Sequence, residues 1–155
     1  MTTLKPGRKA PKFSATIQTG EQVKLEDYRG KKLILFFYPK DNTPTCTVEA
    51  CNLRDNFSKL KKEGFQLLGV SPDSEKKHNN FINKFDLPFD LIADTDLKVI
   101  KAYKCWGLKK FMGREFEGVY RTTFVIDEEG KLELVITKVK SKDHTNQILE
   151  LLAAV

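Results

Sequence analysis

The stretch from Leu33 to Val70 constrains the fold more than any other part of the sequence. It begins with an unbroken apolar run, Leu33–Tyr38, which is typical of a strand covered on both faces of a sheet. Apolar residues at steps of four and three follow, and Gly64 ends them, as expected of a helix with one face toward a core. This apolar stripe consists of Cys46, Ala50, Leu53, Phe57 and Leu60. Phe65–Val70 is a second strand, so the stretch predicts a right-handed βαβ unit.

Two further pairs of segments have the pattern of β-hairpins. Phe13–Ile17 and Gln22–Leu25 flank a short polar turn near the amino terminus. Tyr120–Ile126 and Leu132–Ile136 flank Asp127–Gly130, a strong turn signal.

The remaining patterns predict helices and one short strand. Helices are expected at Ser74–Phe85, with Ser74 as the cap, and from a Thr95 cap to Tyr103. Phe89–Ala93 is short and extended, and a last helix opens at Asp143. The apolar residues of this last helix are Ile148, Leu149, Leu151 and Leu152. The order of elements predicts an α/β, thioredoxin-like fold in a single domain, residues 1–155, with a central mixed sheet flanked by helices and an amino-terminal β-hairpin extension.

Composition excludes several classes of function. The chain has 155 residues, 40% hydrophobic and 31% charged, the balance of an ordinary globular domain. No apolar run is long enough for a membrane span, and Met1–Pro6 lacks the apolar core of a signal peptide, so a cytoplasmic location without membrane contact is expected. The net charge of +6 comes from lysines spread along the chain, so no nucleic-acid partner is expected, although the charge could steer an acidic reductase.

Cys46 has the clearest chemical signal. It lies where the first strand passes into the long helix, and free backbone N–H groups and the helix dipole stabilise negative charge there. The thiolate is the nucleophilic form of cysteine, so this position favours a reactive residue. Cys46 also lies on the apolar stripe, and the alternative is a small buried hydrophobic side chain.

The residues around Cys46 resemble a known family. Pro39–Cys46 has the Pro-x-x-x-Thr-x-x-Cys spacing of the peroxiredoxin active-site signature, and Phe37–Arg54 is similar to the peroxiredoxin Q group, also called bacterioferritin comigratory proteins. The likeness continues through Leu68–Asp73, Trp106-Gly107, Phe111–Gly113 and Arg121–Asp127. One departure is Thr45, where the family usually has glycine.

The resemblance implies roles for the residues near Cys46. Cys46 would attack a peroxide and become a sulfenic acid. Thr43 would place its hydroxyl within reach of thiolate and peroxide, and Pro39 would shield the site from water. Arg121 would stabilise the thiolate and the leaving oxygen. Without the family, Pro39 and Thr43 can be turn residues, which leaves the spacing of Thr43 unexplained. Arg121 is then equally consistent with a site residue and with an edge-strand arginine facing solvent.

The other two cysteines differ in their relation to the family. Cys51 matches the resolving cysteine of the group, which implies a Cys46–Cys51 disulfide. Five residues along an ideal helix separate Cα atoms by about 8 to 9 Å, whereas a disulfide needs about 7 Å or less. We therefore expect the first turns of the helix to unwind on oxidation. Cys105, which the family usually lacks, has either a structural role or that of an alternative resolving or glutathionylated thiol.

The predicted function is that of a thiol peroxidase for hydrogen peroxide and organic hydroperoxides. It would be recycled by thioredoxin or a similar dithiol and act as a monomer or weak dimer. His78 and His144 are expected at the surface, and no cofactor or metal site is expected. Two alternatives stay open: a thioredoxin-like disulfide oxidoreductase, for which the usual Cys-x-x-Cys is absent, and a basic redox-sensing binding module.

Overall fold

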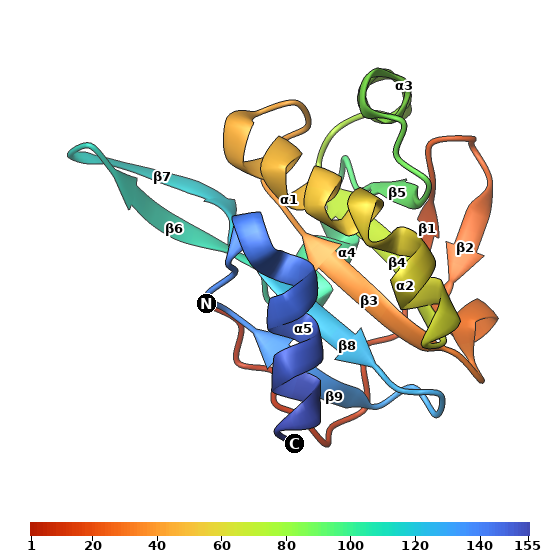
Figure 1. The fold of residues 1–155 in the computed structure, drawn as a ribbon. Helices are drawn as coiled ribbons and strands as arrows, with labels where there is room; N and C mark the ends of the chain where they lie inside the picture. Colours follow the sequence, from red (N-terminus) through yellow and green to blue (C-terminus); the bar gives the residue numbers. More distant parts are fainter.

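The computed structural model describes residues 1–155, and a five-stranded mixed sheet forms its centre (Figure 1). The middle strand β3 (Lys32–Phe37) is parallel to β4 (Phe65–Ser71) and antiparallel to β8 (Thr122–Ile126). The edge strands are β5 (Asp90–Ala93), beside β4, and β9 (Leu132–Ile136), beside β8. All of β8 and all of β3 except Lys32 are buried, because both faces of the sheet are covered. The predicted α/β class with a central mixed sheet is confirmed.

Alternate residues of β3 point to opposite faces of the sheet and divide the interior into two cores. The first core contains Leu33, Leu35 and Phe37, and the second contains Ile34, Phe36 and Tyr38. Cys105 lies in the first core, whereas Cys46 lies in the second. The sheet therefore separates these two cysteines.

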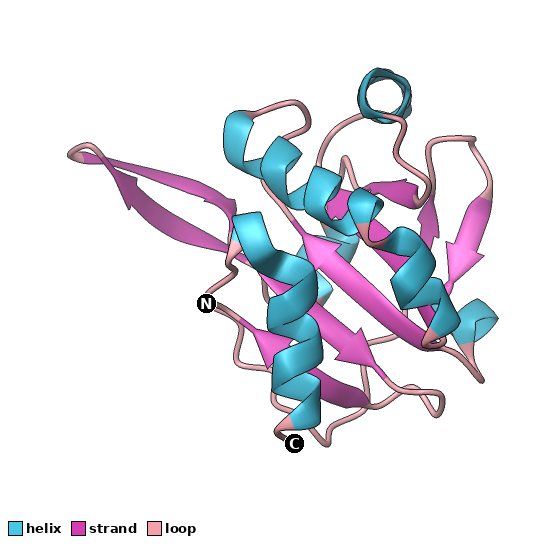
Figure 2. Cartoon of the chain, in the orientation of Figure 1, coloured by secondary structure: helices cyan, strands magenta, loops and turns pink.

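Helices cover both faces of this sheet (Figure 2). The second core is lined by α1 (Pro44–Asp55), α2 (Phe57–Lys62), α3 (Glu75–Phe85) and α5 (His144–Ala153). The short helix α4 (Lys98–Ala102) covers the first core, and 3-10 turns occur at Leu25–Tyr28 (η1) and Ser141–Asp143 (η2). None of the helices combines the length and apolar character that crossing a membrane requires.

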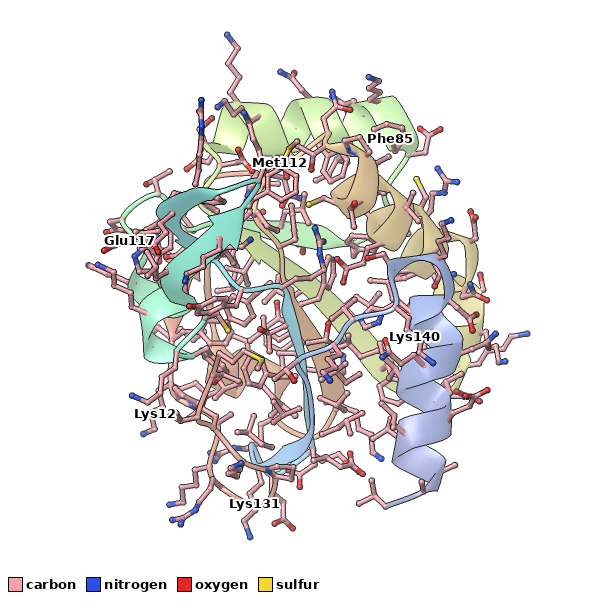
Figure 3. The ribbon with its side chains drawn as sticks, turned by 90° about the vertical axis from the view of Figure 1, so that its left-hand side faces the viewer. Lys12, Phe85, Met112, Glu117, Lys131 and Lys140 are labelled. Carbon is pink, nitrogen blue, oxygen red and sulfur yellow. The ribbon has the colours of Figure 1, made fainter.

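The chain forms two separate hairpins outside the central sheet. The predicted amino-terminal hairpin is confirmed as β1 (Ser14–Thr16) and β2 (Gln22–Lys24). A second hairpin, β6 (Trp106–Phe111) and β7 (Arg114–Val119), was not predicted. It extends away from the body of the protein (Figure 1), with Met112 at its turn (Figure 3). Most of its side chains are exposed, so the alternation that marks a half-buried strand is missing.

Two of the predicted helices differ in detail from the structure. The helix expected to run from Cys46 through Leu60 is two helices, because Asn56 has non-helical dihedral angles of φ −109° and ψ 11°. Leu151 on α5, one of the apolar residues of the last predicted helix, is 40% exposed.

The predicted caps have mixed outcomes. The Ser74 cap of α3 is confirmed, because its side chain accepts the N–H of Lys77. Thr95 is not the cap of α4, which begins at Lys98, two residues later than that cap requires. The carboxylate of Asp94 accepts two N–H groups of α4 instead, at 3.2 and 2.8 Å.

Candidate active site

Cys46 lies in the first turn of α1, and its side chain is 3% exposed. Thr43 is the residue before the helix and Pro44 is the first helical residue, where the missing N–H of proline costs no hydrogen bond. The first helical bond runs from the Thr47 N–H to the Thr43 carbonyl oxygen, at 2.9 Å. The N–H groups of Thr45 and Cys46 precede it and have no carbonyl partner within the helix. The predicted position of Cys46 at the start of a helix is confirmed.

Arg121 lies directly before β8, and its guanidinium contacts the sulfur of Cys46. Its Nη2 atom is 3.1 Å from Cys46 Sγ, and its Nη1 atom is 2.7 Å from Glu49 Oε1. Burial works against the charge of Arg121, but the negative charges of Glu49 and Cys46 outweigh this, so that its pKa is raised. A planar guanidinium that keeps its charge when buried stabilises negative charge on the sulfur. The structure therefore turns Arg121 toward Cys46 and not toward open solvent.

Glu49 is a member of this site that the sequence interpretation missed. It is 1% exposed, and burial raises its pKa to about 7, although the charge and hydrogen bond of Arg121 act in the opposite direction. Its Oε2 atom has no hydrogen-bond partner. The signal was present in the sequence, because Glu49 follows Cys46 by three residues and so lies on the same helix face.

His144 lies behind Glu49, and the prediction that it lies at the surface was wrong. It is fully buried, and its Nδ1 atom is 2.9 Å from Gln147 Oε1 while its Nε2 atom is 2.8 Å from Thr123 Oγ1. Burial lowers the pKa of His144 to about 4, so the ring is neutral at pH 7. The 3.5 Å approach of His144 Nε2 to Glu49 Oε2 is therefore not a salt bridge at that pH.

Pro39 and Thr43 lie in the loop between β3 and α1. Pro39 is half-buried, and the Thr43 hydroxyl donates to the carbonyl oxygen of Lys40 at 2.9 Å. To donate to the sulfur or to a peroxide, the Thr43 side chain would have to rotate away from Lys40. Thr45, the departure from the family pattern, is exposed and has no positive φ angle, so this position does not require glycine.

Cys51 lies on α1 with Cys46, and both thiols are free. Cys51 is half-buried, five residues along an intact helix from Cys46. The two Cα atoms of such a pair are too far apart for a disulfide without movement of the backbone.

Cys105 is fully buried in the first core, across the sheet from Cys46. Its Sγ atom lies 3.4 Å from the carbonyl oxygen of Tyr103. Burial raises its pKa to about 12, which leaves the thiol un-ionised near neutral pH. These properties favour the structural role over the alternative resolving thiol.

Comparisons with known proteins show the family to which this chain belongs. Residues 6–135 match the model of the AhpC/TSA family. The chain is 46% identical to Peroxiredoxin Bcp of Bacillus subtilis over 150 residues, which are 97% of this chain and 96% of the relative. A structure of Xanthomonas campestris peroxiredoxin Q has a TM-score of 0.87 at 32% identity, covering 99% of this chain and 97% of that one. A further Xanthomonas campestris structure, of a bacterioferritin comigratory protein described for alkyl peroxide reduction, has a TM-score of 0.87 at 31% identity, covering 99% and 98% of the two chains.

Proposed function

The chain belongs to the AhpC/TSA family and, within it, to the Bcp peroxiredoxins, and we propose that Cys46 is the nucleophile with which it reduces peroxides. The protein is a thiol-dependent peroxidase. The observation that carries the assignment to Cys46 is the 3.1 Å contact between its sulfur and the Arg121 guanidinium, in the first turn of a helix. Both features stabilise a thiolate.

In the first step, the Cys46 thiolate attacks one oxygen of the peroxide. An S–O bond forms as the O–O bond breaks, and the sulfur, which supplies the two electrons, becomes a sulfenic acid. The other oxygen leaves with negative charge and takes up a proton, giving an alcohol, or water from hydrogen peroxide. Arg121 stabilises the thiolate beforehand and the leaving oxygen during the step. Thr43 orients the peroxide through its hydroxyl after that hydroxyl rotates away from the Lys40 carbonyl oxygen, and Pro39 keeps water away.

In the second step, Cys51 resolves the sulfenic acid. Its thiol attacks the Cys46 sulfur, an S–S bond forms, and the hydroxyl leaves as water. Because both cysteines lie on α1, the front of this helix must unwind first. Side-chain hydrogen bonds tie this front part to the rest of the protein through Arg121, which Cys46 and Glu49 contact.

The rear of α1 is tied directly to two other parts of the chain by side-chain hydrogen bonds. The Asn52 amide donates to the Lys142 carbonyl oxygen at 3.2 Å and accepts the Thr145 N–H at 2.8 Å. Arg54 donates to the carbonyl oxygen of Phe85 at 2.8 Å. We therefore infer that unwinding stops at Asn52, one residue beyond Cys51.

The substrates and the reductant follow from this chemistry. We propose hydrogen peroxide and organic hydroperoxides as substrates, and a dithiol of the thioredoxin type as the reductant of the Cys46–Cys51 disulfide. Such recycling requires a reducing compartment, for which we propose the cytoplasm. We propose one domain, residues 1–155, as the working unit, present as a monomer or a weak dimer.

The test is peroxide consumption coupled to thioredoxin, thioredoxin reductase and NADPH. Cys46→Ser should abolish turnover while it leaves the fold intact, because serine is close to cysteine in volume. Reduction of a protein disulfide substrate, measured in parallel, should be slow for the native protein. Normal peroxide turnover in Cys46→Ser would overturn the assignment of the nucleophile.

A further inference from the structure

A buried polar cluster lies behind the loop that carries Pro39 and Thr43. We define this loop-anchor cluster as Tyr38, Asp41, Ser71, Asp73 and His78. Its centre is Asp41, whose Oδ1 atom accepts the Tyr38 hydroxyl at 2.6 Å and whose Oδ2 atom lies 2.6 Å from His78 Nδ1. The Asp41 N–H donates to Asp73 Oδ2 at 2.8 Å, and the Ser71 hydroxyl donates to the same oxygen at 2.7 Å.

The buried position of His78 was not expected from the sequence. Its polar neighbours in the helix predicted a surface position, and that prediction was wrong. The ring is 0% exposed. Its Nε2 atom lies 2.8 Å from the carbonyl oxygen of Ile92, which only accepts, so Nε2 carries a hydrogen. Both ring nitrogens therefore have partners, one on the loop and one on β5.

None of the buried side-chain nitrogen and oxygen atoms of the cluster lacks a hydrogen-bond partner. Burial, followed by the charge of Asp41, raises the pKa of Tyr38 well above its ordinary value, so its hydroxyl remains a donor to Asp41. Asp41, Asp73 and His78 have the chemistry of metal ligands, but the facing atoms of the three are engaged in hydrogen bonds within the cluster. A buried network with these partners is rigid, because breaking any bond leaves a polar group unpaired away from water.

The cluster joins the loop to several elements at one end of the sheet. Tyr38 follows β3, Asp73 follows β4, and His78 lies on α3. Asp41 is the point where these elements meet the loop, two residues from Pro39 and two from Thr43. By contrast, Asn42 beside it is exposed, has a left-handed φ of 60°, and accepts an exposed hydrogen bond from Lys84 Nζ at 3.3 Å.

We propose that His78 and Asp41 are positioning residues for peroxide reduction, which hold the loop so that Thr43 and Pro39 keep their places beside Cys46. This inference rests on the proposed function, since it takes Cys46 as the reacting residue. His78 makes no hydrogen bond to the sulfur and acts only through the loop.

This proposal separates two properties of Cys46. The thiolate is stabilised by Arg121 and the helix terminus, whereas the peroxide is oriented by the loop. Two reactions of the same sulfur should therefore respond differently to changes in the cluster. Reaction with peroxide needs the loop, but alkylation by iodoacetamide needs only an accessible thiolate.

The experiment measures both second-order rate constants at Cys46, with alkylation followed by mass mapping. In His78→Leu the peroxide rate constant should fall by at least about tenfold, because misplacement of a positioning group costs this much or more. The alkylation rate constant should stay close to that of the native protein. Tyr38→Phe removes one hydrogen bond to Asp41 and keeps the ring. It should lower the ratio of the peroxide rate constant to the alkylation rate constant by a smaller factor than His78→Leu does. His78→Asn should restore part of the ratio, because its amide can donate to Asp41.

Ser74→Ala is the matched control, because it removes the cap of α3 without touching the cluster. It should lower stability and leave the ratio of the two rate constants unchanged. The proposal would be overturned if both rate constants fell equally in Tyr38→Phe and His78→Leu. It would also be overturned if the ratio of the peroxide to the alkylation rate constant were unchanged in all cluster variants. Tyr38→Phe keeps the test valid even if His78→Leu folds poorly. Cys46→Ser is assayed in parallel. Peroxide turnover in that variant would contradict the proposed function of Cys46, whereas the cluster variants test only the positioning role of His78 and Asp41.

Discussion

The Nη2 atom of Arg121 lies 3.1 Å from the sulfur of Cys46, although 75 residues separate the two in the sequence. The other arm of the guanidinium holds the buried carboxylate of Glu49 at 2.7 Å. If Arg121 turned away from the sulfur, Glu49 would be left without its charge partner in the interior, which is costly. Glu49 therefore fixes the cation beside Cys46.

Replacing Arg121 should slow the first chemical step. In Arg121→Ala the thiolate and the leaving oxygen lose their cation, and the second-order rate constant with peroxide should fall more than about tenfold, or about 1.4 kcal/mol. Arg121→Lys should keep only part of the rate, because an ammonium does not bridge Cys46 and Glu49 as a planar fork does. Stopped-flow measurement of the first turnover gives the rate, and ultraviolet absorbance gives the thiolate fraction. An unchanged rate and thiolate fraction in Arg121→Ala would remove Arg121 from the site.

Glu49 and His144 should have opposite effects on stability between about pH 4 and 7. The pKa of Glu49 is raised from 4.5 to about 7 in the folded protein, so its contribution is present at low pH and is lost as the pH rises through 7. The pKa of His144 is lowered from 6.5 to about 4, so folding is favoured above 6.5 and this contribution is lost as the pH falls through 4. The two dependences oppose each other in the native protein.

Glu49→Gln should reveal the effect of His144. The free energy of unfolding of this variant should fall more steeply than that of the native protein as the pH is lowered from 6.5 toward 4. Urea unfolding over this range measures both curves. Parallel curves would show that the proton affinity of Glu49 is not altered by folding.

Cys51→Ser should separate peroxide reduction from recycling. The variant should react once with peroxide at the native rate, because Cys46 and Arg121 are unchanged. It should then accumulate sulfenic acid, turn over poorly with thioredoxin, and over-oxidise to sulfinic acid. Mass spectrometry of the oxidised peptides follows each form. Rapid thioredoxin-dependent turnover in Cys51→Ser would exclude Cys51 as the resolving residue.

Unwinding on oxidation should stop at Asn52. In the oxidised protein, amide exchange should be fast from Thr45 to Cys51, while Leu53–Asp55 and β3 stay protected. Asn52→Ala loses the hydrogen bonds to Lys142 and Thr145, on the order of 1 to 2 kcal/mol, and should spread fast exchange to the rear of α1. Asn146→Ala, which removes an exposed amide contact with Asp143, is the control and should leave the boundary in place. Protection of the whole of α1 in the disulfide form would contradict the unwinding mechanism.

Cys105 should matter for stability and not for turnover. Cys105→Ala removes a buried sulfur from the first core and should cost on the order of 1 kcal/mol, because the cavity relaxes only in part. Peroxide turnover should remain native, since the sheet separates Cys105 from Cys46. A mapped Cys46–Cys105 disulfide, with Cys51 free, would reverse these assignments.

The elements with one buried face could be predicted because burial leaves a period in the sequence. The stripe from Cys46 to Leu60 is an example, and it lies in the second core as expected. The strand at Leu33–Tyr38 is buried on both faces, so it was predicted from its unbroken apolar run, and it contributes to both cores. The β6–β7 hairpin was missed because Leu108, Phe111 and Phe116 are exposed and give no such period, although Met112 and Gly113 at its turn both have positive φ angles.

The two histidines show that the sequence pattern of a single helix does not reveal hydrogen-bond partners from other elements. Polar neighbours along the helix suggested surface positions for His78 and His144. The partners that bury them come from elsewhere: Asp41 is 37 residues from His78, and Thr123 is 21 residues from His144. A buried polar side chain is stable only when such distant partners satisfy it.

The order of the elements and the position of Cys46 at the start of a helix follow from the sequence alone, because hydrophobic period and turn chemistry act between neighbours in the chain. The tertiary structure alone decided that Arg121 faces Cys46, that Glu49 holds Arg121, and that Cys105 lies across the sheet from both. These relations depend on which strands pair and which faces of the sheet they bury. Pairing of segments that are distant in the sequence brings these charged groups together away from water.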